Sequence, residues 1–214
     1  MTLINELVII YLRKVICMVH RLSKMIANFL LHKNVISETE IDIYIYGYET
    51  IILGIIDFFI VLIVGLIFNQ FITMLIFFTM FISVKLYTGG YHANTVLKCK
   101  AVFISICISL VFLLEFKFPY YLHILIMLLY LITSLITSFF LAPIENHNKP
   151  LTSEEQTKYR RISIAMSLFW SIADVFSYFF AIKICTSITV TAFFITLLMI
   201  IGEYGKGGKD NAQE

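Results

Sequence analysis

Long stretches of apolar residues without charge constrain this chain more than any other feature of its sequence. Between Thr50 and Val84 the only charged residue is Asp57, whereas one membrane-spanning helix needs about 20 apolar residues. The stretch is therefore long enough for two spans, which a hairpin at Asn69-Gln70 would join. Only 14% of all residues are charged, and this excludes an ordinary soluble domain, for which about 25% is typical.

Four further stretches of the chain are apolar and carry at most one charged residue. Together with the first they predict an all-α, polytopic membrane protein with about six transmembrane helices, the third of them short. Pro119 separates the third from the fourth, because proline at a helix start costs no hydrogen bond. The four stretches are Ala101–Leu114, Phe118–Ile144, Ile162–Ile182, in which Asp174 is the only charge, and Ile184–Gly202.

The chain begins with a segment of a different kind. Over residues 3–31 apolar residues return at helical spacing with charged residues between them, which predicts an amphipathic helix lying on the membrane surface. Ser37 and Glu40 have the spacing of a capping box, so a second helix should begin near Glu38. We therefore divide the chain into an interfacial helix (1–36), a transmembrane domain (37–205) and a flexible polar tail (206–214).

The positions of the basic residues predict the orientation in the membrane. If the N-terminus is inside, all sixteen Lys and Arg residues except Lys117 and Lys183 face the cytoplasm, as positive residues prefer. Both termini should then be cytoplasmic. The net charge of +2 gives no basic excess for binding nucleic acid, and the spacing of the four cysteines indicates neither a disulfide framework nor a metal site.

One predicted cytoplasmic connection, residues 85–100, concentrates the reactive side chains. It contains Gly89-Gly90, then His92, and Cys99 seven residues later. A cysteine nucleophile needs a base, and an imidazole is a common one. On an unbroken helix this spacing separates the Cα atoms by about 10 Å, so a joint action requires a bend. The glycine pair permits one, in the form of a re-entrant turn that lines a wet cavity.

The neighbours of Cys99, namely Lys98 and Lys100, would also favour its thiolate. The other cysteines, and three of the other histidines, have no glycine pair near them in the sequence. We interpret Cys17, Cys107 and Cys185 as packing residues, and His20, His32 and His123 as interfacial histidines without a reactive neighbour.

Asp57 and Asp174 lie in apolar stretches, where a carboxylate costs about 2.5–3.5 kcal/mol, so both should face the interior. They indicate either a polar lock between helices or an ion pathway. We favour the lock, because the sequence has no internal repeat of the kind that transporters use.

A second cytoplasmic connection covers Pro143–Arg161, and its first part, between Pro143 and Pro150, should be extended. His147 within it is either a hydrated loop histidine or a second catalytic one. Thr152 to Glu155 then begins a short helix that continues with basic residues.

These connections resemble those of the AgrB family, accessory gene regulator protein B of Gram-positive quorum sensing. The resemblance covers roughly residues 40–205, and one residue departs from the pattern, since the family usually has arginine where Lys85 stands. It is carried by Lys85-x-x-x-Gly89-Gly90-x-His92-Ala93 followed by Cys99, by Pro143 with Asn148-Lys149-Pro150-Leu151, and by Tyr46-Gly47-Tyr48-Glu49.

The resemblance implies a cysteine endopeptidase in the plasma membrane of a Gram-positive bacterium, with a cytoplasmic active site. It would cleave the C-terminal tail from an AgrD-type precursor peptide through a thioester on Cys99, with His92 as base, and cyclise the peptide to a thiolactone or lactone. It also implies a homodimer, and we expect no metal or cofactor.

We add two further assignments to this reading. The backbone around Gly89, Gly90 and Ala93 would form the turn and an oxyanion hole, and Lys85 and Lys149 would contact the acidic tail of the precursor. The competing interpretation is a small transporter or scaffold that uses Asp57 and Asp174.

Overall fold

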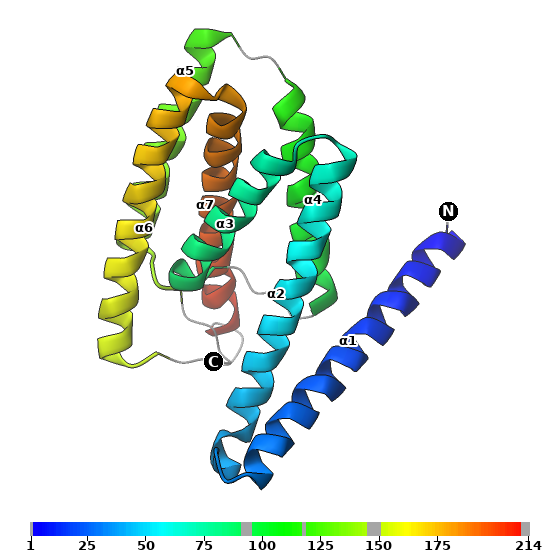
Figure 1. Ribbon diagram of the computed structural model, residues 1–214. Helices are drawn as coiled ribbons and strands as arrows, with labels where there is room; N and C mark the ends of the chain where they lie inside the picture. The colour runs from blue at the N-terminus through cyan, green and yellow to red at the C-terminus, as the bar shows by residue number, and fades with distance from the viewer. Residues whose placement is uncertain (1, 91–95, 117–118, 145–150, 211–214) are drawn as a thin grey trace. The chain divides into compact units, whose positions relative to one another are not determined.

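The computed structural model describes residues 2–90, 96–116, 119–144 and 151–210, and the regular elements of this part are all helical (Figure 1). The all-α prediction is thus confirmed. The chain forms two compact units, Met1–Ile60 with Asn94–Ala101, and Val61–Ala93 with Val102–Glu214. The elements are α1 (Thr2–His32), η1 (Glu38–Glu40), α2 (Ile41–Ile67), α3 (Phe71–Thr88), α4 (Val96–Glu115), α5 (Tyr120–Phe140), α6 (Ser153–Phe180) and α7 (Ile182–Asp210).

Among the described residues, five helical segments are long and apolar enough to cross a membrane, as expected of a polytopic membrane protein. They lie at η1 with α2, and in α3, α5, α6 and α7. The third predicted span, the short one, falls within α4, whose first turn carries Lys98 and Lys100; its crossing of the membrane stays a prediction. The predicted helix at the N-terminus is present as α1, and its position on the membrane surface also stays a prediction.

The helix ends agree with the local signals in the sequence, with two corrections. Both capping boxes are present, at Ser37 and at Thr152, and Pro119 is the N-cap of α5. The helix that begins after Thr152 is not short, however, because it continues without a break into the fifth predicted span as α6. In addition, α7 extends to Asp210, beyond the start of the predicted tail at Lys206.

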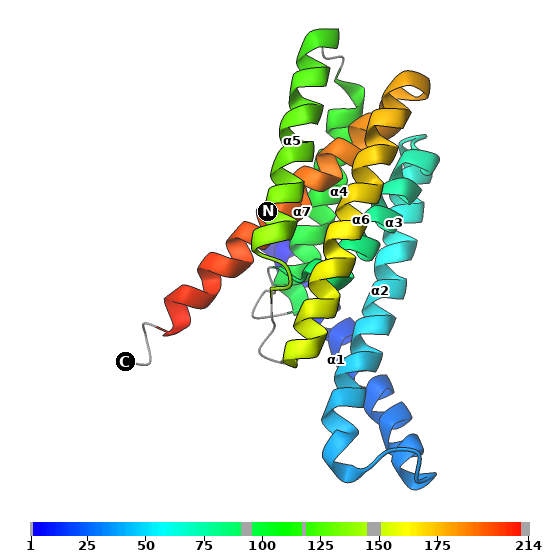
Figure 2. The ribbon, with the colours of Figure 1, turned by 90° about the vertical axis from the view of Figure 1, so that its left-hand side faces the viewer.

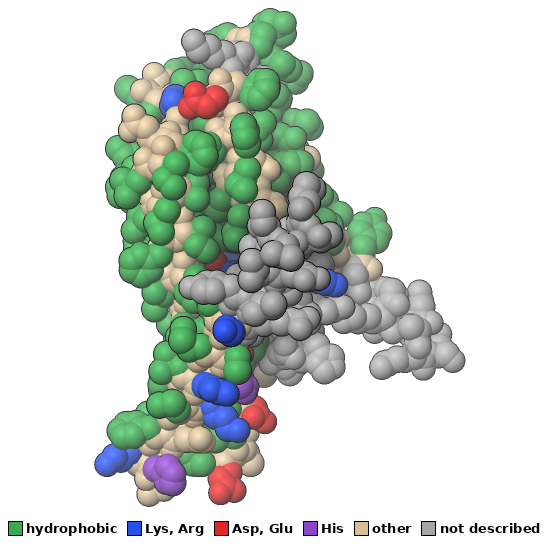
Figure 3. Space-filling model, turned by 90° about the vertical axis from the view of Figure 1, so that its right-hand side faces the viewer, with side chains coloured by type: hydrophobic (Ala, Val, Ile, Leu, Met, Phe, Trp, Pro, Cys, Tyr) green, Lys and Arg blue, Asp and Glu red, His purple; other side chains and the backbone are tan. Residues whose placement is uncertain are grey.

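The polarity of α6 is inverted relative to a helix of a soluble protein. Its buried side chains are mostly hydroxyls, whereas large apolar side chains cover its outer face. Figure 3, which views the molecule from another side, likewise shows hydrophobic side chains over much of the described surface. This arrangement suits a helix in a lipid bilayer, because apolar side chains can face lipid without cost. The buried residues are Ser163, Ser167, Ser171, Asp174 and Ser177, and the exposed ones include Leu168, Phe169, Ile172, Phe176, Phe179 and Phe180.

In the second unit α7 packs against α3, α5 and α6, and these four helices lie side by side in both views (Figures 1 and 2). Polar side chains join them in pairs. The Ser138 hydroxyl of α5 lies 2.6 Å from that of Ser167 in α6. The Ser187 hydroxyl of α7 donates to the backbone carbonyl of Thr73 in α3, at 2.9 Å. Hydrogen bonds between helices therefore fix their register within an apolar core.

The first unit contains a buried ion pair. Lys100 Nζ of α4 lies 2.6 Å from Asp57 Oδ1 of α2 and donates to the Leu53 carbonyl oxygen at 2.9 Å. The side chains of Lys100 and Asp57 are only 11% and 19% exposed. Asp57 therefore faces the interior as predicted, and its geometry is that of a lock between helices.

Replacing Lys100 by methionine should leave the Asp57 carboxylate without its positive partner. Removing one member of a buried pair typically costs about 3–5 kcal/mol, so we expect a clear fall in the thermal unfolding midpoint of Lys100→Met in detergent. The double variant with Asp57→Asn should recover much of the loss. An unchanged midpoint for Lys100→Met alone would show that the pair does not stabilise the fold.

Candidate active site

The glycine pair forms the C-terminal cap of α3 and the start of the segment that leads to His92. The Gly89 N–H donates to the Lys85 carbonyl oxygen at 3.1 Å. Gly89 has φ of 71° and Gly90 has φ of 119°, a region in which residues with a Cβ are strained. A Cβ on Gly89 would also overlap the carbonyl oxygen of Ile144. Both glycines therefore adopt backbone conformations that other residues rarely adopt.

The two segments predicted to be cytoplasmic connections meet at this cap. The Ile144 N–H donates to the Thr88 carbonyl oxygen at 2.8 Å, and Gly89 and Ile144 form a parallel β-bridge. Thr88 is fully buried, and Ile144 is 4% exposed. Segments that are far apart in the sequence are therefore held together three residues before His92 and five before Lys149.

The first turns of α6 hold this bridge in place. Arg160 Nε donates to the Ala142 carbonyl oxygen at 3.0 Å, and Ala142 is fully buried. The Tyr159 ring lies edge-on to that of Tyr87 near the end of α3, with ring centroids 5.7 Å apart. Arg160 therefore holds the backbone two residues before Ile144, the residue that pairs with Gly89.

Gly90 directs the chain against α7. It is buried, and a Cβ at this position would come within 3.3 Å of the Leu198 carbonyl oxygen. Only a residue without a side chain fits at this distance without displacing the backbone of α7.

Cys99 lies in the first turn of α4 as a free, half-buried cysteine. The first turn of a helix has positive electrostatic potential, which favours an anion there. Lys98 is exposed. Lys100 differs from expectation, because its ammonium group is bound to Asp57 and Leu53 instead of being available to the thiol.

The remaining predicted site residues are Lys85, His92, Ala93 and Lys149. Lys85, in the last turn of α3, is half-buried and its ammonium lies 5.1 Å from the centroid of the Phe81 ring. His92, Ala93 and Lys149 lie outside the described residues. The pairing of His92 with Cys99 and the contact of Lys149 with a substrate therefore stay predictions.

A thiol and an imidazole that the sequence did not bring together are neighbours in the second unit. Cys185 Sγ of α7 lies 3.4 Å from His123 Nε2 and 3.7 Å from Met127 Sδ, both of α5. The expectation that His123 has no reactive neighbour was thus wrong, since a separation of 62 residues leaves no local pattern. Cys185 is fully buried and His123 is 9% exposed, which leaves little room for a peptide substrate.

Within the part of the chain that the structure describes, no three His, Cys, Asp or Glu side chains are grouped so as to hold a metal ion.

Comparison with known proteins adds what geometry alone does not give. Residues 23–201 match the family model described as Accessory gene regulator B. The chain belongs to the AgrB family. A protein of Clostridium perfringens (strain 13 / Type A), Putative AgrB-like protein 2, is 29% identical over 145 residues, which are 66% of this chain and 68% of that protein. No solved structure matches. Membership of the AgrB family implies a general role in processing AgrD precursor peptides.

Gly89→Ala should separate the role of the bridge from that of the fold. The added Cβ would collide with Ile144 and displace the segment before His92, and a displacement of 1 Å at a reactive site can cost about 100-fold in rate. We expect a loss of that order in AgrD cleavage, measured on membranes with matched amounts of protein. Gly54→Ala is the control, because a Cβ there meets nothing within 4 Å. Equal activity of the two variants would contradict the assignment.

Proposed function

We propose that this AgrB-family chain is a membrane-embedded cysteine endopeptidase that removes the C-terminal tail of an AgrD-type precursor and cyclises the remaining peptide. The observation that carries this proposal is the bridge between Gly89 and Ile144. It joins the segment with the glycine pair to the segment that begins at Pro143, and these are the two parts of the chain in which we place the catalytic and substrate-binding residues.

In the proposed reaction His92 takes the proton of the Cys99 thiol, and the thiolate attacks a carbonyl carbon of the precursor. The peptide C–N bond breaks, and the proton passes from His92 to the leaving amine of the tail. The peptide stays on Cys99 as a thioester. A Cys or Ser side chain of the same peptide then attacks this thioester, which closes the ring and returns the Cys99 thiol.

The position of Cys99 supports this role. It is half-buried in the first turn of α4, where the positive potential of a helix start favours the thiolate. A thioester that is partly shielded from water is more readily cyclised than hydrolysed.

The backbone N–H groups around Gly90 to Ala93 are our candidates for the oxyanion hole. Gly90→Ala should therefore lower the turnover of the precursor while leaving membrane insertion intact, because the added Cβ would press on the backbone at Leu198 and shift these groups. Turnover and membrane content are measured on the same membranes. Unchanged turnover would remove this assignment.

For the substrate, we propose that Lys85 and Lys149 contact the acidic tail of the precursor. Both would face the cytoplasm, together with the two termini, in the orientation favoured by the basic residues. A lysine at position 85 offers a point charge instead of the bidentate grip of arginine. We further propose that the protein acts as a homodimer, as the family resemblance implies.

The competing function, a small transporter or scaffold, rests on Asp57 and Asp174. The carboxylate of Asp57 is paired with Lys100, and that of Asp174 accepts a hydrogen bond from Thr189 at 2.8 Å. Contacts of this kind join neighbouring helices and favour a structural role for both residues.

The deciding experiment is the intact mass of the purified protein after mixing with a cognate AgrD precursor. Wild type should gain a peptide adduct that hydroxylamine removes, as expected of a thioester. Cys99→Ala should form no adduct, and His92→Ala should form it much more slowly, because the thiol loses its base.

Cys185→Ser is the matched control, because Cys185 is a described thiol that lies beside an imidazole, that of His123. It should form the adduct at the wild-type rate. An adduct that persists in Cys99→Ala and disappears in Cys185→Ser would move the nucleophile to Cys185. If a verified precursor gives neither adduct nor cleavage with wild type, the peptidase proposal fails.

A further inference from the structure

Two carboxylates of α2 contact neighbouring helices at different heights along its axis. Near its start, the Oε1 atom of Glu49 lies 2.6 Å from the Nδ1 atom of His20 in α1. Asp57 follows eight residues later as the only charge of the apolar stretch, which corresponds to about 12 Å along a helix. In the predicted arrangement α1 lies on the membrane surface. Asp57 then lies well inside the hydrocarbon core, which is about 30 Å thick.

This deeper carboxylate holds the first turn of α4. A lysine near a helix end commonly extends its ammonium group to the membrane surface and to water. Lys100 differs, since it is only 9% exposed and its Nζ contacts both Asp57 Oδ1 and the Leu53 carbonyl oxygen, at 2.6 and 2.9 Å. Two oxygen atoms of α2 therefore fix the start of α4 beside the apolar part of α2.

The ion pair concerns the proposed nucleophile because Cys99 directly precedes Lys100. The Cα atoms of consecutive residues are about 3.8 Å apart, and both residues belong to the first turn of α4. One compact unit contains this turn together with α2 as far as Ile60. The ion pair therefore determines the height at which Cys99 lies beside α2.

A lock that only joins α2 to α4 could lie anywhere along the two helices, whereas this pair lies one residue from the reactive thiol. We propose, resting on the function proposed for Cys99, that Asp57 and Lys100 are positioning residues for the reaction. Their ion pair holds the thiol near the depth of Asp57, and the precursor brings its carbonyl carbon to the thiol at that depth. Water is scarcer there, which protects the thioester.

The position of Cys99 can be followed by thiol labelling of the full-length protein in lipid nanodiscs. Two reagents are compared. One is neutral N-ethylmaleimide, and the other is a methanethiosulfonate with a trimethylammonium group, whose charge disfavours entry into hydrocarbon. Peptide mass spectrometry gives the labelling rate at Cys99 itself, and each rate is divided by that of the unfolded protein.

Asp57→Asn should displace the thiol towards water. Without its counter-charge the ammonium group of Lys100 should extend to the membrane surface and carry the first turn of α4 with it. The ratio of charged to neutral labelling at Cys99 should then rise by roughly 10-fold. The kcat of precursor cleavage should fall by about 100-fold, as a displacement of 1 Å can cause, whereas KM should change by less than about three-fold.

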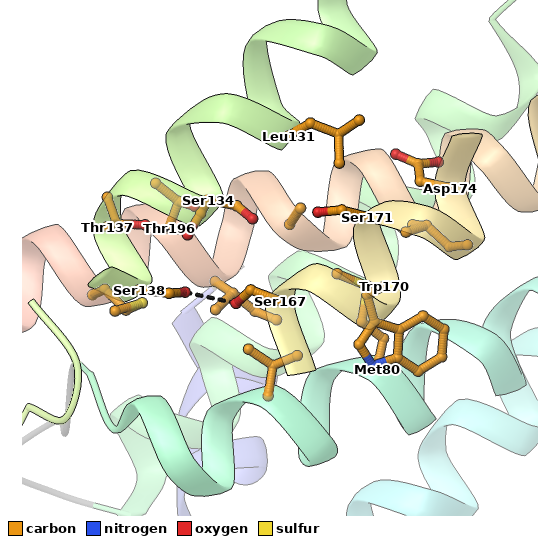
Figure 4. Close-up of a pocket in the computed structure, with 15 residues that line it drawn as sticks. Met80, Leu131, Ser134, Thr137, Ser138, Ser167, Trp170, Ser171, Asp174 and Thr196 are labelled. Atoms are coloured by element: carbon orange, nitrogen blue, oxygen red, sulfur yellow. Dashed lines mark hydrogen bonds between the residues drawn. The ribbon is translucent and has the colours of Figure 1, made fainter. Parts of the chain in front are cut away.

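Asp174→Asn is the matched control, because it makes the same substitution at the other intramembrane aspartate. The Asp174 carboxylate belongs to the second unit, where it extends from α6 towards Leu131 of α5 (Figure 4) and accepts a hydrogen bond from Thr189. Both the labelling ratio and the kcat should stay at their wild-type values.

The double variant of Asp57→Asn with Lys100→Met separates positioning from stability. Neither charge remains, so most of the unfolding midpoint should be recovered, and this variant decides if Asp57→Asn alone does not fold. Its kcat should nevertheless stay about 100-fold below that of wild type. Lys100→Arg keeps the ion pair, and its kcat should stay within about 10-fold of wild type.

An unchanged labelling ratio in Asp57→Asn would overturn the proposal, and so would a double variant that recovers cleavage together with its unfolding midpoint. The labelling measurement needs no precursor peptide. If labelling changes as expected but wild type cleaves no verified precursor, the peptidase proposal fails, whereas the placement of Cys99 by the ion pair stands.

Discussion

Hydrocarbon offers no hydrogen-bond partners, so each polar group within the membrane must find its partner inside the protein. This constraint explains the inverted polarity of α6, whose hydroxyls face α5 and α7 while its phenylalanines face outward. It explains equally why Lys100 and Asp57 meet in the first unit. In both units polar contacts therefore join neighbouring helices, and in the second unit apolar side chains fill the core around them.

Much of the helical architecture could be predicted from the sequence, because it depends on local patterns. Uncharged stretches mark the spans, Pro119 and the capping box at Thr152 mark helix starts, and the hairpin at Asn69-Gln70 lies between α2 and α3. Residue pairs far apart in the chain could not be predicted in the same way. The cost of a carboxylate in an apolar stretch predicts that Asp57 faces inward, but it does not show which helix carries its partner.

In the candidate site, too, local features could be predicted and tertiary contacts could not. The glycine pair was predicted to supply backbone freedom, and both glycines have positive φ angles, whereas the bend that would bring His92 to Cys99 stays a prediction. That Ile144 pairs with Gly89, and that Lys100 is bound to Asp57 instead of lying free beside Cys99, depends on tertiary contacts. The neighbours Cys185 and His123 are likewise on different helices. Residues brought together by packing of helices leave no signature in a single sequence.

The bridge between Gly89 and Ile144 also makes the two segments thermodynamically dependent on each other. Residues 145–150 follow directly after Ile144, and residues 91–95 follow Gly90. Because the bridge holds Gly89 and Ile144 together, a shift of the main chain at one of them is transmitted to the other, and such a coupling is reciprocal by linkage. One short pairing of main chain would then make any change at the end of α3 felt at the segment that begins at Pro143, and the reverse.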